Sequence, residues 1–201
     1  LESYPAIIAQ QMKLTGDKVG DFTQPLMQDN IGGFKDLGVK GKLQLELVNG
    51  SLSPVYQTAQ SSFDYGTLNG QKFSNLGVPG AKSYHLVYDG YGNPAGISKK
   101  TANPYFVRFA TSATTSVLKD AMAQNPTFFS LWIGNNDVLG YATSGGDGSD
   151  IITPTDTFNN AYTALVATLT SKGAKGVVAN IPDVTAIPFF TTIPYNAIPL
   201  D

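Results

Sequence analysis

The chain has no cysteine, a single histidine and few charged residues, which make up 14% of its 201 positions. Without cysteine, it can form neither a disulfide bond nor a thiolate metal site, and it holds no cysteine nucleophile. Its 13 basic residues form no run longer than Lys99-Lys100, which argues against a nucleic-acid partner. No apolar run is long enough to cross a bilayer, so we expect no transmembrane segment in this chain.

What the chain does contain is typical of one globular domain, which we expect to span residues 1–201. Apolar residues make up 42% of the sequence, enough for a sizeable core. Glycine and proline number 21 and 12, and together with the low charge they predict a neutral surface rich in loops. This pattern favours an exported protein, located in the cell envelope or outside the cell.

Predicted helices and strands alternate along most of the chain. We expect helices where apolar side chains recur every three to four residues, and strands where short apolar runs end at turn residues. The expected helices are 4–14, 114–125 and 155–171, and the expected strands are 73–76, 128–133 and 176–181. The final strand–helix–strand order indicates a parallel crossover, and hence a three-layer α/β/α sandwich with a mostly parallel sheet. Residues 42–57 alternate around Asn49-Gly50, which predicts a β-hairpin inserted into this fold.

Three glycine-rich stretches are predicted to be loops. Residues 20–41 would border a substrate cleft, and the tyrosines of residues 84–103 suit either an apolar site or surface packing. Residues 143–150 suggest either a mobile lid or a calcium loop through Asp147 and Asp150. Their spacing lacks the ligands of an EF-hand, and no phosphate-loop or dinucleotide fingerprint is present. We therefore expect neither a metal nor a cofactor.

The most informative segment runs from Phe128 to Asp137, where an apolar run ends in Gly134, Asn135 and Asn136. In α/β sheets, functional groups lie just beyond the carboxyl ends of the strands. The polar side chains here would therefore project into a binding site. The alternative is a plain Asn/Asp turn between two elements.

This segment, together with the glycine-rich turn of residues 73–82, resembles the SGNH, or GDSL, hydrolases. These are serine esterases and lipases with a flavodoxin-like α/β/α fold. The family's third motif, Gly-x-Asn-Asp, matches Gly134 to Asp137 and implies that Asn136 is an oxyanion-hole donor. The glycine of the second motif matches Gly80, with Gly77 as a further candidate.

The resemblance implies a role for these residues in ester cleavage. The tetrahedral intermediate concentrates negative charge on one oxygen, which the Gly80 amide and the Asn136 side chain would stabilise as neutral donors. Asp137 and Asn135 would hold the Asn136 loop by hydrogen bonds. The substrate would be a small-molecule, lipid or glycan ester. Residues 3–11 and 75–82 are also similar to the secreted or lipid-anchored branch found in Bacteroidetes-type bacteria.

The family's other two motifs are absent from this chain. The sequence contains no Gly-Asp-Ser-Leu to supply a nucleophile, and no Asp-x-x-His to supply a base. Ser3 does not replace the nucleophile, because it is better explained as a helix cap before Pro5. The only histidine, His85, lies far upstream of the family's catalytic base, so we assign it to packing or to the substrate rim. Asp183 is expected to be either another rim residue or a turn residue.

Two hypotheses account for the missing motifs. In the first, this chain is the middle of a longer hydrolase, incomplete at both ends, whose serine and histidine lie outside it. In the second, the chain is a non-catalytic binding domain, such as a glycan-binding one, on the same scaffold. Both predict that the chain by itself is inactive on esters.

Overall fold

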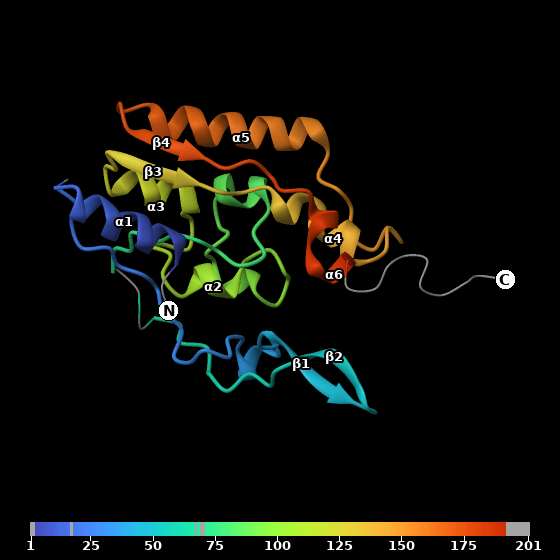
Figure 1. Cartoon of the computed structure of the whole chain (residues 1–201). Helices are drawn as coiled ribbons and strands as arrows, with labels where there is room; N and C mark the ends of the chain where they lie inside the picture. Colours follow the sequence, from blue (N-terminus) through green and yellow to red (C-terminus); the bar gives the residue numbers. More distant parts are fainter. Residues whose placement is uncertain (1–2, 17, 67, 69–70, 192–201) are drawn as a thin grey trace. The chain divides into compact units, whose positions relative to one another are not determined.

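A computed structural model describes residues 3–16, 18–66, 68 and 71–191 of the chain (Figure 1). Two compact units are present, and each is assembled from two stretches of sequence. Unit 1 comprises Leu1–Gly77 and Gly92–Ala113, and unit 2 comprises Val78–Tyr91 and Thr114–Asp201. The architecture is mixed α/β, with a small antiparallel sheet in unit 1 and a small parallel sheet in unit 2. The expectation of a single domain stays a prediction.

The described part of unit 1 contains two helices, a hairpin and two short 3₁₀ helices. Their bounds are α1 Tyr4–Leu14, η1 Lys35–Leu37, β1 Leu43–Val48, β2 Ser51–Tyr56, η3 Pro94–Gly96 and α2 Pro104–Val107. Helix α1 begins where the Ser3 hydroxyl accepts a hydrogen bond from the Ala6 amide, with Pro5 in its first turn. The predicted bounds of this helix and the capping role of Ser3 are confirmed.

The hairpin predicted over residues 42–57 is confirmed as β1 and β2. Asn49 and Gly50 form its turn with φ values of 52° and 82°, the left-handed pair that a type I′ turn requires. Antiparallel pairing runs from Leu43 opposite Tyr56 to the residues beside the turn. Every residue of β1 is exposed, so neither face of this strand is covered.

The core of unit 1 is built mainly from aromatic rings. Phe34, Phe73, Phe106 and Phe109 are all buried. Phe109 meets Phe106 edge to face at 5.4 Å between ring centroids, and it meets Phe73 in the same way at 5.7 Å. Edge-to-face geometry is the favoured arrangement for such pairs.

The strand expected over residues 73–76 is wrong, because this segment has an irregular backbone. The amides of Ser74 and Asn75 both donate to the Thr23 carbonyl, which belongs to a loop and not to a strand. The apolar start of the segment reflects the burial of Phe73 and carries no strand pairing. Residues 20–41 form the expected loop, interrupted only by η1 and an isolated bridge between Phe34 and Val39 within the described residues.

Unit 2 contains the parallel crossover that the sequence predicts. Its elements are η2 Ser83–Val87, α3 Val117–Ala123, β3 Phe128–Leu131, α4 Asn135–Thr143, α5 Thr155–Thr170, β4 Lys175–Val178, η4 Val184–Ala186 and α6 Pro188–Thr191. Strands β3 and β4 pair in parallel, with Phe128 opposite Lys175 and Leu131 opposite Val178. Helix α5 precedes β4 in the connection between the two strands (Figure 1). It packs against η2 and α3 and buries Leu165. The predicted strand–helix–strand unit is confirmed, with shorter strands.

Two details of unit 2 differ from the prediction. Helix α3 starts at Val117, three residues later than expected, because the Ser116 hydroxyl caps it by accepting from the Lys119 amide. Helix α4 contains Asn136, which was expected to lie in a loop. None of the helices in the described part of the chain is both long and apolar enough to cross a membrane.

Candidate functional site

The candidate site begins where β3 passes through Gly134 into helix α4. Gly134 has a φ of 118°, which side chains other than glycine rarely allow. A Cβ atom at this position would lie 2.5 Å from Cδ1 of Ile181, which follows β4. Gly134 therefore allows both the sharp turn and the close approach of the two strand ends. Because β3 and β4 pair in parallel, their carboxyl ends lie at the same edge of the sheet.

The side chain of Asn136 contacts the turn that contains Gly80. Asn136 Nδ2 donates to the Ala81 carbonyl at 2.9 Å. Gly80 lies one residue before this acceptor, in a turn closed by a bond from the Ala81 amide to the Val78 carbonyl at 3.2 Å. Pro79 followed by Gly80 at a φ of 76° is typical of a type II turn. The structure thus brings together the two residues predicted as oxyanion donors.

The carboxylate of Asp137 anchors the same turn to helix α4. Asp137 Oδ2 accepts from the Ser83 amide at 2.8 Å, and Oδ1 accepts from the Ser83 hydroxyl at 2.7 Å. Both residues are buried, with exposed fractions of 2% and 0%. A buried carboxylate is stable only when its oxygens are satisfied, and Ser83 supplies a partner for each. Asp137 therefore joins helix α4 to the segment that follows the Gly80 turn.

The other residues predicted around Asn136 are arranged differently. Asn135 Oδ1 is buried and has no hydrogen-bond partner within the described residues. The amide of Gly77 donates to Asn75 Oδ1 at 2.9 Å, so it is already engaged. Within the described part of the chain, no acceptor bonds the Gly80 amide. Of the two glycines, Gly80 is therefore the one with a donor available to a ligand.

His85 lies in η2, packed between two tyrosine rings. Its ring stacks on Tyr91 at 4.6 Å and 11°, and it meets Tyr84 at 4.4 Å. Burial, followed by the positive charge of Lys82, lowers the pKa of His85 below its ordinary value, although Asp137 opposes the shift. The side chain is therefore neutral near pH 7.

The hydrogen bond to His85 also fixes which ring nitrogen carries the proton. Nδ1 accepts from the Lys82 amide at 3.0 Å, so the proton of the neutral ring lies on Nε2. A general base needs a free lone pair, and the only one on this ring is engaged by the backbone. The geometry agrees with packing, one of the two roles that the sequence leaves open for His85.

The acidic loop over residues 143–150 directs its two carboxylates to different partners. Asp147 accepts from the Ser149 amide at 2.8 Å, and hydrogen bonds from Ser149 lower its pKa. Asp150 pairs with Lys82 Nζ at 2.7 Å, and this hydrogen bond lowers the pKa of Asp150. Among the described residues, no three acidic or histidine side chains converge as a metal site would require.

Asp183 caps the short helix η4. Its Oδ1 accepts from the Thr185 amide at 2.9 Å and from the Thr185 hydroxyl at 2.7 Å. These bonds lower the pKa of Asp183, with the hydroxyl contributing most. The Asp183 carboxylate thus bonds a residue two positions further along the chain, which agrees with the turn role, one of the two that the sequence leaves open.

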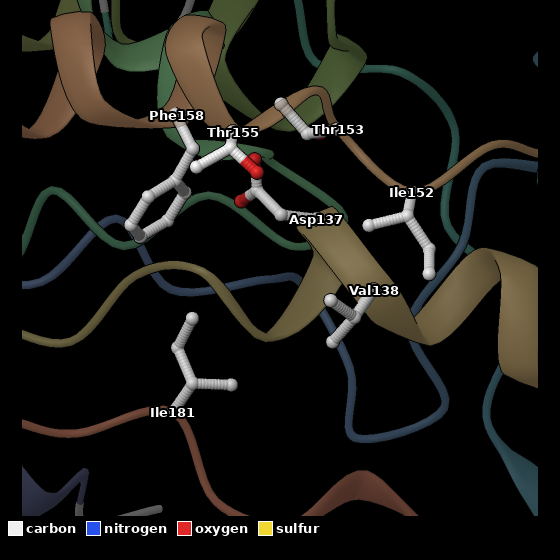
Figure 2. Close-up of a pocket in the computed structure, with 7 residues that line it drawn as sticks. All are labelled: Asp137, Val138, Ile152, Thr153, Thr155, Phe158 and Ile181. Atoms are coloured by element: carbon white, nitrogen blue, oxygen red, sulfur yellow. The ribbon is translucent and has the colours of Figure 1, made fainter.

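A pocket of about 200 Å³ lies beside the start of helix α4. Figure 2 shows Asp137 and Val138 reaching it from α4, with Thr155 and Phe158 from α5 and Ile181 from the segment after β4. Ile152 and Thr153 complete its lining. Because Ser83 satisfies the Asp137 carboxylate, the pocket presents mainly aliphatic and aromatic surface. It suits a small apolar group.

Sequence reasoning missed the two residues that fix the turn, Ser83 and Lys82. Each bonds a carboxylate more than 50 positions away in sequence, and no local pattern marks such a pairing. The only signal for Ser83 is that it follows the Gly80 turn closely.

No family model matches this chain, and neither a curated protein nor a solved structure matches it at a significant level. The functional assignment therefore depends on the residues and geometry described above.

Proposed function

We propose that this chain supplies the oxyanion-stabilising part of an SGNH-type serine ester hydrolase with a three-layer α/β/α fold. Its substrates would be lipid, acyl or acetylated-carbohydrate esters, and the protein would be exported. The observation that carries the proposal is the hydrogen bond from Asn136 Nδ2 to the Ala81 carbonyl, one residue after Gly80. The matching motif at Gly134 to Asp137 supports the same assignment.

The chemistry of the Asn136 amide suits stabilisation of a developing negative charge. A primary amide has two N–H donors, and the Ala81 carbonyl engages only one of them. The bond to Ala81 therefore orients the amide while its second hydrogen stays available to a substrate oxygen. Asn136 also lies in the first turn of α4, where the helix dipole favours negative charge.

The turn that carries Gly80 is held rigidly enough to preorganise a second donor. Asp137 bonds both polar groups of Ser83, and Lys82 pairs with Asp150. Donors fixed before the reaction need no reorganisation as charge develops, which is the source of their catalytic value. The apolar pocket beside Val138 would hold the acyl part of the ester.

The nucleophile and the base would come from outside this chain. The only histidine, His85, has its Nδ1 lone pair engaged by the Lys82 amide, so it does not serve as the base. In the complete site, the serine hydroxyl would attack the ester carbonyl, and the resulting oxygen anion would bind Asn136 and Gly80. A histidine would take the serine proton and return it to the leaving alcohol.

The test is ester hydrolysis by the longest native chain that contains this sequence, with p-nitrophenyl esters of short and long acyl chains. We expect Asn136→Ala to lower kcat about 100-fold or more, as removal of an oxyanion donor does elsewhere. The matched control is Asn159→Ala, which removes an exposed asparagine from helix α5 of the same unit. Thermal unfolding of both variants separates loss of catalysis from loss of structure.

Each outcome bears on the proposal. A large fall in kcat for Asn136→Ala alone, with wild-type thermal stability, supports the oxyanion role. Equal activity of the two variants contradicts it. If the longest native chain hydrolyses none of the esters, the hydrolase is excluded and a non-catalytic binding domain becomes the better assignment.

A further inference from the structure

Hairpin β1–β2 carries all of its leucines on one face. Side chains alternate between the two faces of a strand, and directly paired residues share a face. The register places Leu43 opposite Tyr56, Leu45 opposite Pro54 and Leu47 opposite Leu52. These six residues, called the apolar face below, therefore form one continuous surface.

The apolar face is the more exposed side of the hairpin. The exposed fraction rises from 49% at Leu43 to 74% at Leu47, and Leu52 beside the turn is 68% exposed. On the opposite face, the polar Ser53 and its neighbour Val55 are partly covered. A hairpin stabilised only by its own domain would place its apolar side inward. An exposed apolar patch of this kind indicates a surface that binds something.

The charges around the hairpin are arranged unevenly. Lys40 Nζ lies 5.0 Å from the ring centroid of Tyr56, at the base of the apolar face. The only acidic residue in the two strands, Glu46, pairs with Ser53 and so lies on the opposite face. The charge at the edge of the apolar face is thus the positive one of Lys40, which complements an anionic surface.

The size of the apolar face argues against a second copy of the chain as its occupant. Six-residue strands span about 20 Å, and two strands are about 10 Å wide, giving a footprint of about 200 Å². Each partner in a specific, stable complex contributes about 800 Å². The accessible surface is larger than this flat footprint, because side chains protrude from it, but even twice the footprint, about 400 Å², is only half of that value. A lipid bilayer has no such minimum, because its surface adapts to any apolar side chain.

We propose that the apolar face binds the surface of a lipid bilayer with anionic headgroups. The leucine side chains enter the boundary between headgroups and acyl chains, while Lys40 lies beside the lipid phosphates. The backbone stays in the hydrated headgroup layer, because the unpaired outer edges of a two-stranded sheet cannot be satisfied in hydrocarbon. This role is separate from ester hydrolysis and does not depend on it.

The test is co-sedimentation of the full 201-residue chain with vesicles of phosphatidylcholine and phosphatidylglycerol in equal amounts. We expect the wild-type chain to pellet with these vesicles, and the double variant Leu45→Gln/Leu47→Gln to bind roughly tenfold less. The matched control is Val48→Gln, which makes an exposed valine polar on the opposite face and is expected to bind like wild type. Circular dichroism verifies that all three chains fold alike.

Charge and self-association supply two further readouts. Lys40→Gln, and vesicles of phosphatidylcholine alone, are each expected to weaken binding. The proposal is overturned if wild type does not pellet with the vesicles, or if the leucine double variant binds as strongly as wild type. It is also overturned if the wild-type chain is a dimer by light scattering, the leucine double variant is a monomer, and neither binds vesicles. A second copy of the chain would then be the occupant.

Discussion

Ser83 satisfies both oxygens of the Asp137 carboxylate, although 54 positions separate the two residues in the sequence. One bond comes from the Ser83 amide and the other from its hydroxyl, so a single residue supplies a hydrogen-bond donor to each oxygen of the buried carboxylate. The turn containing Gly80 and the helix containing Asn136 are fixed to one another by this contact. We regard it as the structural centre of the candidate site.

Removal of the Ser83 hydroxyl is expected to destabilise unit 2. Ser83→Ala leaves Asp137 Oδ1 buried without that donor, which costs about 1–3 kcal/mol of unfolding free energy. Ser171→Ala removes an exposed hydroxyl from the same unit and is expected to cost less than about 0.5 kcal/mol. Urea unfolding of the two variants measures the difference. Equal stabilities would mean that the serine hydroxyl is dispensable.

Two glycines of the site are expected to differ in their sensitivity to alanine. Gly80→Ala adds a Cβ atom in open space, so only its positive φ opposes the change, at a cost of about 1–2 kcal/mol. Gly134→Ala also places a side chain at a positive φ, of 118°, and forces a clash with Ile181, which adds about 1–3 kcal/mol. Thermal unfolding should rank Gly134→Ala as the more damaging substitution. The reverse order would contradict the close approach of the two strand ends.

Stability is expected to fall on mild acidification because of His85. Its pKa is lowered in the folded chain, mainly by burial, so below about pH 6.5 the unfolded chain binds a proton that the folded chain resists. Unfolding free energy should therefore decrease from pH 7.5 to pH 5.5, by no more than about 1.4 kcal/mol.

His85→Asn is the control for this pH dependence. It retains an acceptor near the Lys82 amide but removes the titrating ring, and the chain has no other histidine. Urea unfolding at the two pH values should show the decrease in wild type and little of it in the variant. The same decrease in both would assign it to other groups.

Arg108 is expected to be the most sensitive charged residue of unit 1. It is 2% exposed, bonds the carbonyls of Pro25 and Leu26, and pairs with the Asp64 carboxylate, where Nη2 lies 2.8 Å from Oδ2. Arg108→Met leaves that carboxylate buried without its cation, which costs about 3–5 kcal/mol.

The control for Arg108 is an exposed ion pair of the same unit. Lys13→Met breaks the pair with Asp21, whose carboxylate is fully exposed, and should lower stability by less than about 1 kcal/mol. Thermal unfolding followed by circular dichroism compares the two. A comparable loss in both variants would show that burial of the Arg108 pair contributes little.

The sequence predicted correctly those elements whose ends are set by neighbouring residues, such as a helix cap or a hairpin turn. Ser3 and Pro5 define the start of α1, and Asn49-Gly50 defines the hairpin turn, so both elements appear where expected. Phe73 misled the prediction, because an apolar residue indicates burial and cannot specify which backbone partner is available. Its segment bonds a loop carbonyl instead of a strand.

The candidate site was only partly predictable for the same reason. The motif placed Asn136 beside the Gly80 turn, and the bond from Asn136 to Ala81 brings those segments together. Helix α4 was missed because Gly134 and the polar residues after it are also typical of turns. The pairing of Ser83 with Asp137 depends on tertiary structure, which no local pattern records.

The interleaving of the two units in the sequence has a consequence for synthesis on the ribosome. Unit 1 needs Gly92–Ala113, which are made only after Val78–Tyr91 of unit 2 have already emerged. Translation adds about 5–20 residues per second, so the first 77 residues wait for seconds with an incomplete aromatic core. During that interval Phe34 lacks Tyr105 as a partner, and Phe73 lacks Phe109. Nascent chains stalled between positions 77 and 92 should therefore be the form that chaperones capture most readily.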